Sequence, residues 1–295
     1  MLSRRAALLA PIAEAMTPPS GKMTLALHQN TSAGAGFAKS LAGWARAGIR
    51  QVELSDTLLD GFLKTGSLAD ARRVVTDLGL TPISAAAVIP DFWLPDPGRA
   101  KKLDLWKLRC AQFASFGIGR LYCPAVTTRK VTAEDYRGAV DCLREAGEAA
   151  AKFEMQAHVE FIRNSSFLST LPTTLKLTRE AAHPNVHPLF DFYHFCTGLS
   201  HTEDLDLVRA GEIGHVHIQD VPDIPREMLD SQTRIIPGDG VAPLVALFRK
   251  LAAKGYAGPV SVELFLSEFT QADPYELAGR IKEKSEAVMR AAGVL

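Results

Sequence analysis

The segment AHVEF (residues 157–161) is a short apolar run that closes on a glutamate, and similar runs return three times in the second half of the chain. These are HPLFDF (187–192), GHVHIQD (214–220) and PVSVELF (259–265). Short apolar runs bounded by turn residues are typical of β-strands. Each run ends on an acid or an imidazole, where the predicted strand passes into a loop. We call these four the strand-tip residues: Glu160, Asp191, His217 and Glu263.

Strand and helix patterns alternate from Met23 to the end of the chain. The predicted strands cover residues 23–28, 51–54, 81–88, 120–123, 155–160, 186–191, 215–219 and 260–265. The predicted helices cover residues 37–47, 68–78, 99–116, 132–151, 175–182, 202–210, 240–254 and 274–292. Eight such units without a break in composition predict an α/β fold, a single (β/α)8 TIM barrel over residues 23–295. A doubly wound open sheet is the alternative, but no G-x-G-x-x-G follows the first strand.

Composition narrows the classes of partner. The chain has 33 basic and 33 acidic residues among 295, so its net charge is zero. Nucleic-acid binding normally needs a basic surplus, and we therefore expect no nucleic-acid partner. No stretch approaches the ~18 apolar residues of a membrane span, so we expect no membrane partner. A homo-oligomer stays open. The four cysteines lack C-x-x-C spacing and are predicted to be free thiols.

Residues 1–22 precede the first strand, and two interpretations of them stay open. MLSRRAALLAPIAEA (1–15) has paired arginines, a short apolar stretch and an A-x-A ending, which is the outline of a twin-arginine export signal. The apolar stretch is interrupted by Pro11 and followed by Glu14, which favours a plain N-terminal extension. The extension predicts a cytoplasmic protein, and the signal predicts an exported one.

The strand-tip residues predict a metal site. In a β/α barrel, the chemistry lies at the carboxyl ends of the strands, and four consecutive ends converge there. One polar strand end is explained by solvation at the rim, whereas charged groups at four apolar strand ends need partners. Three carboxylates and one imidazole suit a catalytic divalent cation.

Two further histidines lie close to the strand-tip residues in sequence. His215 and His217 lie two residues apart and so point to the same face of their strand. His217 is nearer the strand end and is the predicted ligand, and His215 is predicted to be a core histidine. His194 forms D-x-x-H with Asp191, and either a further ligand or a donor to a substrate oxygen would suit it.

The ends of the first two predicted strands also carry ionisable residues. His28 ends the first strand and is followed by Asn30, which favours a place in the substrate pocket. Glu53 ends the second strand, and there we favour a structural role.

The motifs of the second half resemble the xylose isomerase-like barrel superfamily, and specifically its sugar phosphate isomerase/epimerase branch. They are HVEF (158–161), DFYH (191–194), GHVHIQDVPD (214–223), R-x-x-P-G-D-G (234–240) and Y-x-G-P-V-S-V-E-L (256–264). The resemblance covers about residues 23–290 and is strongest from Glu160 onward.

The resemblance implies a single Mn²⁺, Mg²⁺, Co²⁺ or Zn²⁺ ion held by the strand-tip residues. It also implies that Glu160 and Glu263 move the proton and that His194 contacts the substrate. An arginine after the seventh strand would bind a substrate hydroxyl, and Arg226 and Arg234 are the candidates. Ketose epimerases carry another glutamate beyond the first ligand, but residues 161–166 (FIRNSS) contain no acid. This departure argues against ketose 3-epimerisation and leaves related carbohydrate or cyclitol chemistry open.

We therefore expect a metal-dependent isomerase or epimerase of a sugar or sugar-like keto-polyol. A cation would act as Lewis acid on a carbonyl, while a glutamate on each side of the substrate removes or returns the proton. The nearest rival is a lyase acting on a keto-inositol or a 3-keto-glycoside, because the same site with one acting acid would dehydrate. A DNA repair endonuclease of the superfamily would need extra metal ligands and a basic surface. A barrel that only binds a sugar or supports a partner also stays open.

Overall fold

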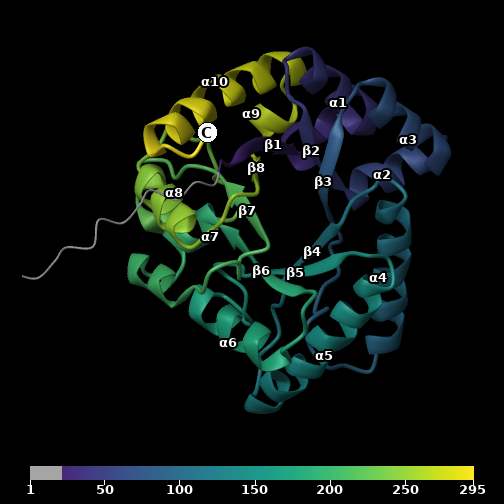
Figure 1. Ribbon diagram of the computed structural model, residues 1–295, viewed down its shortest axis with the longest axis vertical. Helices are drawn as coiled ribbons and strands as arrows, with labels where there is room; N and C mark the ends of the chain where they lie inside the picture. The colour runs from purple at the N-terminus through teal and green to yellow at the C-terminus, as the bar shows by residue number, and fades with distance from the viewer. Residues whose placement is uncertain (1–21) are drawn as a thin grey trace, which may run out of the picture.

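A computed structural model describes residues 22–295 as a closed barrel surrounded by helices (Figure 1). The strands are β1 (Thr24–His28), β2 (Gln51–Ser55), β3 (Thr81–Ala86), β4 (Arg120–Pro124), β5 (Gln156–Glu160), β6 (Val186–Asp191), β7 (His215–Ile218) and β8 (Pro259–Val262). They pair in sequence order, all parallel, and β1 closes the barrel by pairing with β8. The prediction of a (β/α)8 barrel is confirmed.

The helices form a ring around the strands, with α10 beside α1 (Figure 1). The α-helices are α1 (Gly36–Arg46), α2 (Asp56–Leu63), α3 (Leu68–Asp77), α4 (Arg99–Ala114), α5 (Ala133–Ala151), α6 (Leu171–Ala181), α7 (Phe192–Thr197), α8 (Leu244–Ala253), α9 (Ser267–Thr270) and α10 (Pro274–Ala292). The 3₁₀ segments are η1 (Gln29–Ala35), η2 (Thr202–Leu207) and η3 (Arg226–Met228). Within residues 22–295, none of the helices combines the length and apolar character that a membrane crossing requires.

One predicted helix is wrong. Of residues 202–210, only Thr202–Leu207 are helical, as the 3₁₀ segment η2, because the backbone becomes extended at Val208. The helix after β6 is α7 instead. It starts directly after the strand, because the side chain of Asp191 accepts a hydrogen bond from the backbone N–H of His194 and caps its first turn.

Alternation along the strands separates an apolar core from a polar barrel interior. In β5, Ala157 and Val159 belong to the large apolar core that surrounds the barrel, and β7 and β8 repeat this pattern. A second, small apolar cluster contains Ala86, Tyr122 and Leu189. Most of the other inward positions of the strands are buried but polar or ionisable (His28, Glu53, Ser84, His158, Asp191, His215, His217 and Ser261). The site therefore grows out of a polar interior.

The two ends of the barrel sequence meet. The backbone N–H of Met23 donates to the carbonyl of Val294 at 2.6 Å. At the α1–α10 contact, Gly43 allows close approach, because a Cβ there would lie 2.6 Å from the Cβ of Pro274. The cysteines Cys110, Cys123, Cys142 and Cys196 are free, as predicted. Apart from Lys22, the segment 1–22, for which an extension or export signal was predicted, lies outside the described residues.

Candidate metal centre

The strand-tip residues converge at the carboxyl end of the barrel. Glu160 ends β5, Asp191 ends β6, His217 lies in β7 and Glu263 follows β8 directly. One potential ligand atom from each residue lies within 4.8 Å of those from the other three, and all four residues are buried. The Nδ1 atom of His217 lies 3.5 Å from Glu160 Oε1, 3.5 Å from Glu263 Oε2 and 3.8 Å from Asp191 Oδ2.

The donor set of this cluster fits a divalent cation. Among the described residues, the buried atoms Glu160 Oε1 and His217 Nδ1 have no hydrogen-bond partner, although they face each other. Buried polar atoms without partners are costly, and a cation would satisfy both. Three carboxylates and one imidazole are a donor set that would hold Mn²⁺, Mg²⁺, Co²⁺ or Zn²⁺.

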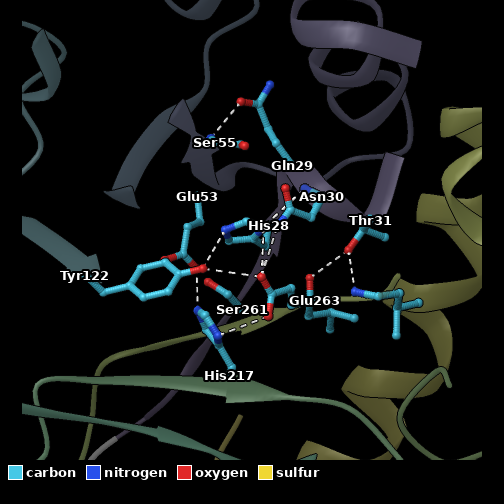
Figure 2. Close-up of polar contacts among 12 residues, drawn as sticks. His28, Gln29, Asn30, Thr31, Glu53, Ser55, Tyr122, His217, Ser261 and Glu263 are labelled. Atoms are coloured by element: carbon cyan, nitrogen blue, oxygen red, sulfur yellow. Dashed lines mark hydrogen bonds and ion pairs between the residues drawn. The ribbon is translucent and has the colours of Figure 1, made fainter. Parts of the chain in front are cut away.

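The orientation of His217 is set from inside the barrel. Its Nε2 lies 3.0 Å from Glu53 Oε2 (Figure 2). The same Oε2 atom also lies 3.0 Å from Nε2 of His215. Burial acts to lower the pKa of His217, but the surrounding carboxylates outweigh it and hold that pKa well above its usual value. Burial likewise acts to raise the pKa of Glu53, yet the two histidines hold it well below the usual value.

Glu263 is restrained on both carboxylate oxygens. Arg234 Nη1 donates to its Oε2 at 2.5 Å, and Asn30 Nδ2 donates to its Oε1 at 3.2 Å. The hydroxyl of Tyr122 donates to the same Oε1 at 3.3 Å, with His28 Nδ1 at 3.5 Å (Figure 2). Burial acts to raise the pKa of Glu263, but His28, Arg234 and His217 hold that pKa well below its usual value. Glu263 is thus an ionised, fixed carboxylate.

Glu160 has a different environment, although it is as buried as Glu263, at 3% exposure each. Among the described residues, its Oε1 accepts no hydrogen bond. Burial raises the pKa of Glu160 to about 7, against the lowering influence of His217. The two strand-tip glutamates are therefore chemically distinct, one free to exchange a proton and the other held ionised.

Asp191 links the cluster to α7. Its Oδ1 accepts from the backbone N–H of His194 at 2.6 Å, and its Oδ2 accepts from Gln219 Nε2 at 2.7 Å. This cap places the His194 side chain 2.8 Å from Arg234 Nη2. Burial lowers the pKa of His194 to about 3, so this imidazole is neutral. His194 and Arg234 together form a buried patch of nitrogen atoms beside the carboxylates.

The structure brings most of the predicted substrate-site residues together and leaves one apart. His28 lies at the cluster, with its Nε2 3.1 Å from the Tyr122 hydroxyl. Arg234 is 2% exposed and lies between Asp191 and Glu263. Arg226 is exposed, and its guanidinium donates to the carbonyl of Gly198 at 3.1 Å. Of the two arginines, the structure therefore places only Arg234 in the cluster.

Tyr122 was not singled out from the sequence. Its only signal is its parity in β4, where Leu121 and Cys123 belong to the outer core and Tyr122 to the interior cluster. The same parity applies to Glu53, whose predicted structural role agrees with its complete burial.

Known proteins resemble this chain in both sequence and fold. Residues 42–289 match the family model described as xylose isomerase-like TIM barrel. The chain belongs to this family. A curated relative in the family, the inosose isomerase of Bacillus velezensis, is 26% identical over 234 residues, covering 78% of this chain and 84% of that protein.

A dehydratase and a zinc-binding protein of known structure also resemble this chain. The 3-dehydroshikimate dehydratase of Pseudomonas putida is 26% identical over 238 residues, covering 79% of this chain but 37% of that protein. A crystal structure of IOLI protein with a binding zinc atom superposes with a TM-score of 0.83 at 23% identity, covering 90% of this chain and 98% of that one. Its likeness shows the same fold. The curated relatives are enzymes of isomerase and dehydratase classes.

Proposed function

We propose that this member of the xylose isomerase-like family is a divalent-metal-dependent isomerase or epimerase of a sugar-like keto-polyol. The observation that carries the proposal is the contrast between two buried glutamates on one imidazole. Glu160 has an oxygen without a hydrogen-bond partner among the described residues, while Glu263 is restrained by Arg234. A proton-transfer site needs a carboxylate that is free to take a proton from carbon, and Glu160 is that group.

The residues around Glu160 divide the remaining tasks. The strand-tip residues would hold the cation, which when bound supplies a Lewis acid for the carbonyl oxygen of the substrate. Arg234 would supply N–H groups for substrate oxygens, and His194 orients the guanidinium by accepting one of its N–H groups at Nε2; the burial of both residues keeps competing water away. Glu263 would serve as the second proton-transfer group in epimerisation only once a bound substrate takes over its hydrogen bond from Arg234, because that contact holds the carboxylate ionised.

A cyclic keto-polyol is the substrate class that we favour. An inosose is a cyclic polyol with one ketone, and inosose isomerase is the activity named for the relative from Bacillus velezensis. The loop after β5 offers no acid to a ketose, because residues 161–166 (FIRNSS) contain none, and its serine hydroxyls donate to backbone carbonyls. Ser165 donates to Phe167 O at 2.7 Å and Ser166 to Arg129 O at 2.6 Å.

A dehydratase is the second candidate. Elimination of a hydroxyl β to the ketone needs one carboxylate that removes the α-proton and passes it to the departing hydroxyl, which leaves as water. Of the strand-tip carboxylates, Glu160 has a buried oxygen without a hydrogen-bond partner among the described residues. The relative named 3-dehydroshikimate dehydratase supports the same reading. In that case Glu263 serves only as a ligand.

The test is deuterium exchange. Metal-free protein is reloaded with Mn²⁺, Mg²⁺, Co²⁺ or Zn²⁺ and incubated in D₂O with keto-inositols, ketoses and keto-glycosides. NMR then reports deuterium at the carbon α to the carbonyl. An isomerised ketone supports the first candidate, and loss of water with a new conjugated absorbance supports the second. Failure of every substrate to exchange contradicts both.

The variants assign the base. We expect Glu160→Gln to lower exchange by roughly 10²–10⁴-fold, the usual contribution of a positioned acid–base group. Glu268→Gln is the matched control, because Glu268 is exposed and lies five residues beyond Glu263. Exchange in Glu160→Gln at the wild-type rate would show that another group removes the proton. Cytoplasmic location, a homo-oligomer and the absence of nucleic-acid partners stay predictions from the sequence.

A further inference from the structure

Glu53 is a buried carboxylate shared by two imidazoles. It lies on β2 at 0% exposure, and its Oε2 atom lies 3.0 Å from Nε2 of His217 (Figure 2). The same oxygen lies 3.0 Å from Nε2 of His215. Both histidines lie on β7, which does not pair with β2 in the barrel. The contact therefore crosses the barrel interior and restrains His217 from a strand that is not a neighbour of β7.

The contact decides which nitrogen of His217 faces the other strand-tip residues. With Nε2–H donated to Glu53, the remaining nitrogen, Nδ1, lies 3.5 Å from Glu160 and 3.5 Å from Glu263. An imidazole without this partner would be free to flip or to carry its proton on Nδ1, where it could not bind a cation. We propose that Glu53 is a positioning residue that holds His217 with Nδ1 as the metal-binding nitrogen. This rests on the proposed metal site.

The rest of the interior holds Glu53 in turn. His215 Nε2 contacts Ser261 Oγ at 3.3 Å as well as Glu53, so the carboxylate is anchored from β7 and, through His215, from β8. Glu53 Oε1 has no hydrogen-bond partner among the described residues. A buried oxygen without a hydrogen-bond partner is energetically costly. An apolar side chain could fill the same space without that cost, as Leu189 does at another interior position. The placement favours a directed role for Glu53.

Metal affinity separates positioning from simple stability. Outer carboxylates that orient a histidine ligand typically affect metal affinity by about 10–100-fold. The metal-stripped full chain is titrated with Zn²⁺ against a chromophoric chelator. We expect Glu53→Met to weaken Zn²⁺ binding by about 100-fold and Glu53→Gln by about 10-fold, because the carboxamide oxygen still accepts the Nε2–H. Ser261→Ala removes only the outer contact to His215 and should leave the affinity within about twofold of wild type.

A spectroscopic measurement reports on the same nitrogen directly. Long-range ¹H–¹⁵N correlation spectra of the zinc-loaded protein should show His217 with a retained Nε2–H and a metal-bound Nδ1. In Glu53→Met, that single pattern should be lost or broadened by exchange between ring orientations. His217→Gln assigns the signal.

The outcomes are distinct. If wild type binds no Zn²⁺, Mn²⁺ or Co²⁺, the metal site fails and this inference fails with it. If wild type binds but both Glu53 variants bind within about twofold of it, the positioning role is refuted and the metal site stands. A lowered melting temperature with unchanged affinity also refutes it, since that marks a purely structural residue. Should Glu53→Met not fold, the isosteric Glu53→Gln carries the test alone.

Discussion

Arg234 is a buried cation placed against two buried carboxylates, and its removal should destabilise the metal-free protein. Its Nη1 lies 2.5 Å from Glu263 Oε2 and 3.4 Å from Asp191 Oδ2, and the residue is 2% exposed. Arg234→Met keeps an unbranched apolar side chain and deletes the charge. Both carboxylates then lose a positive neighbour in a place that water does not reach.

The size of the effect follows from this burial. Removing one partner of a buried ion pair costs about 3–5 kcal/mol. At about 2 °C per kcal/mol for a domain of this size, the melting temperature should fall by roughly 6–10 °C. A divalent cation on the strand-tip residues replaces the missing charge, and at a thousand times its Kd it adds about 4 kcal/mol. Because Arg234 no longer competes for Glu263, the cation should stabilise the variant more than wild type.

The assay is thermal unfolding with EDTA and with saturating Mn²⁺. Arg226→Met is the matched control, since Arg226 is exposed in the same loop and donates only to the carbonyl of Gly198. Its free energy of unfolding should stay within about 0.5 kcal/mol of wild type. The reasoning is refuted if metal-free Arg234→Met melts within about 2 °C of wild type, or if Mn²⁺ raises its melting temperature no further than that of wild type.

Three further predictions concern the frame of the barrel. In urea unfolding, Gly43→Ala should lower the free energy of unfolding by about 1–3 kcal/mol, because its Cβ would meet Pro274 at 2.6 Å. Gly61→Ala, with open space around it, should raise the free energy of unfolding by about 0.5–1 kcal/mol. Equal effects would contradict this reasoning. The hydrogen bond from Arg129 lowers the pKa of Asp135. The stabilising effect of this ionised carboxylate is therefore present above the ordinary carboxyl pKa of ~3.9 and is lost as pH falls through the lowered pKa. Asp135→Asn should be less stable than wild type at pH 7, and this difference in stability should close below pH ~4. Burial raises the pKa of Cys110 to about 12 and that of Cys142 to about 11, and it raises the pKa of the half-buried Cys196 to about 12. The native thiols should therefore resist Ellman's reagent at pH 8, and all four should react after unfolding. Fast reaction of the buried Cys110 or Cys142 in the native protein would contradict this.

The fold and the convergence of the strand-tip residues were predictable because both depend on repetition. Eight alternations imply parallel strands, and parallel strands deliver their carboxyl ends to one rim. Strand parity places His215 and His217 on the same face, and position along the strand made His217 the better ligand, since the residue nearer the strand end lies nearer the rim. The cluster of Glu160, Asp191, His217 and Glu263 agrees with that geometry.

What could not be predicted depends on contacts across the barrel or on irregular loops. Arg226 and Arg234 lie in one long loop without periodicity, so the sequence could not decide between them. The pattern D-x-x-H was read as chemistry, but Asp191 also caps α7, and that second role starts a helix where none was predicted. Tyr122 and Glu53 act through residues on distant strands, and no local pattern reveals such partners.

The same hydrogen bonds hold the strand-tip residues and brace the barrel. Tyr122 on β4 donates to Glu263 beyond β8, and Glu53 on β2 contacts His217 on β7. These hydrogen bonds of the site therefore cross the barrel interior and connect strands that are not neighbours. A substitution at these positions changes the chemistry and the frame together. Divergence of this protein toward new substrates is therefore constrained at the strand ends and at Arg234, and is easier in the segment after β5 and around the exposed Arg226.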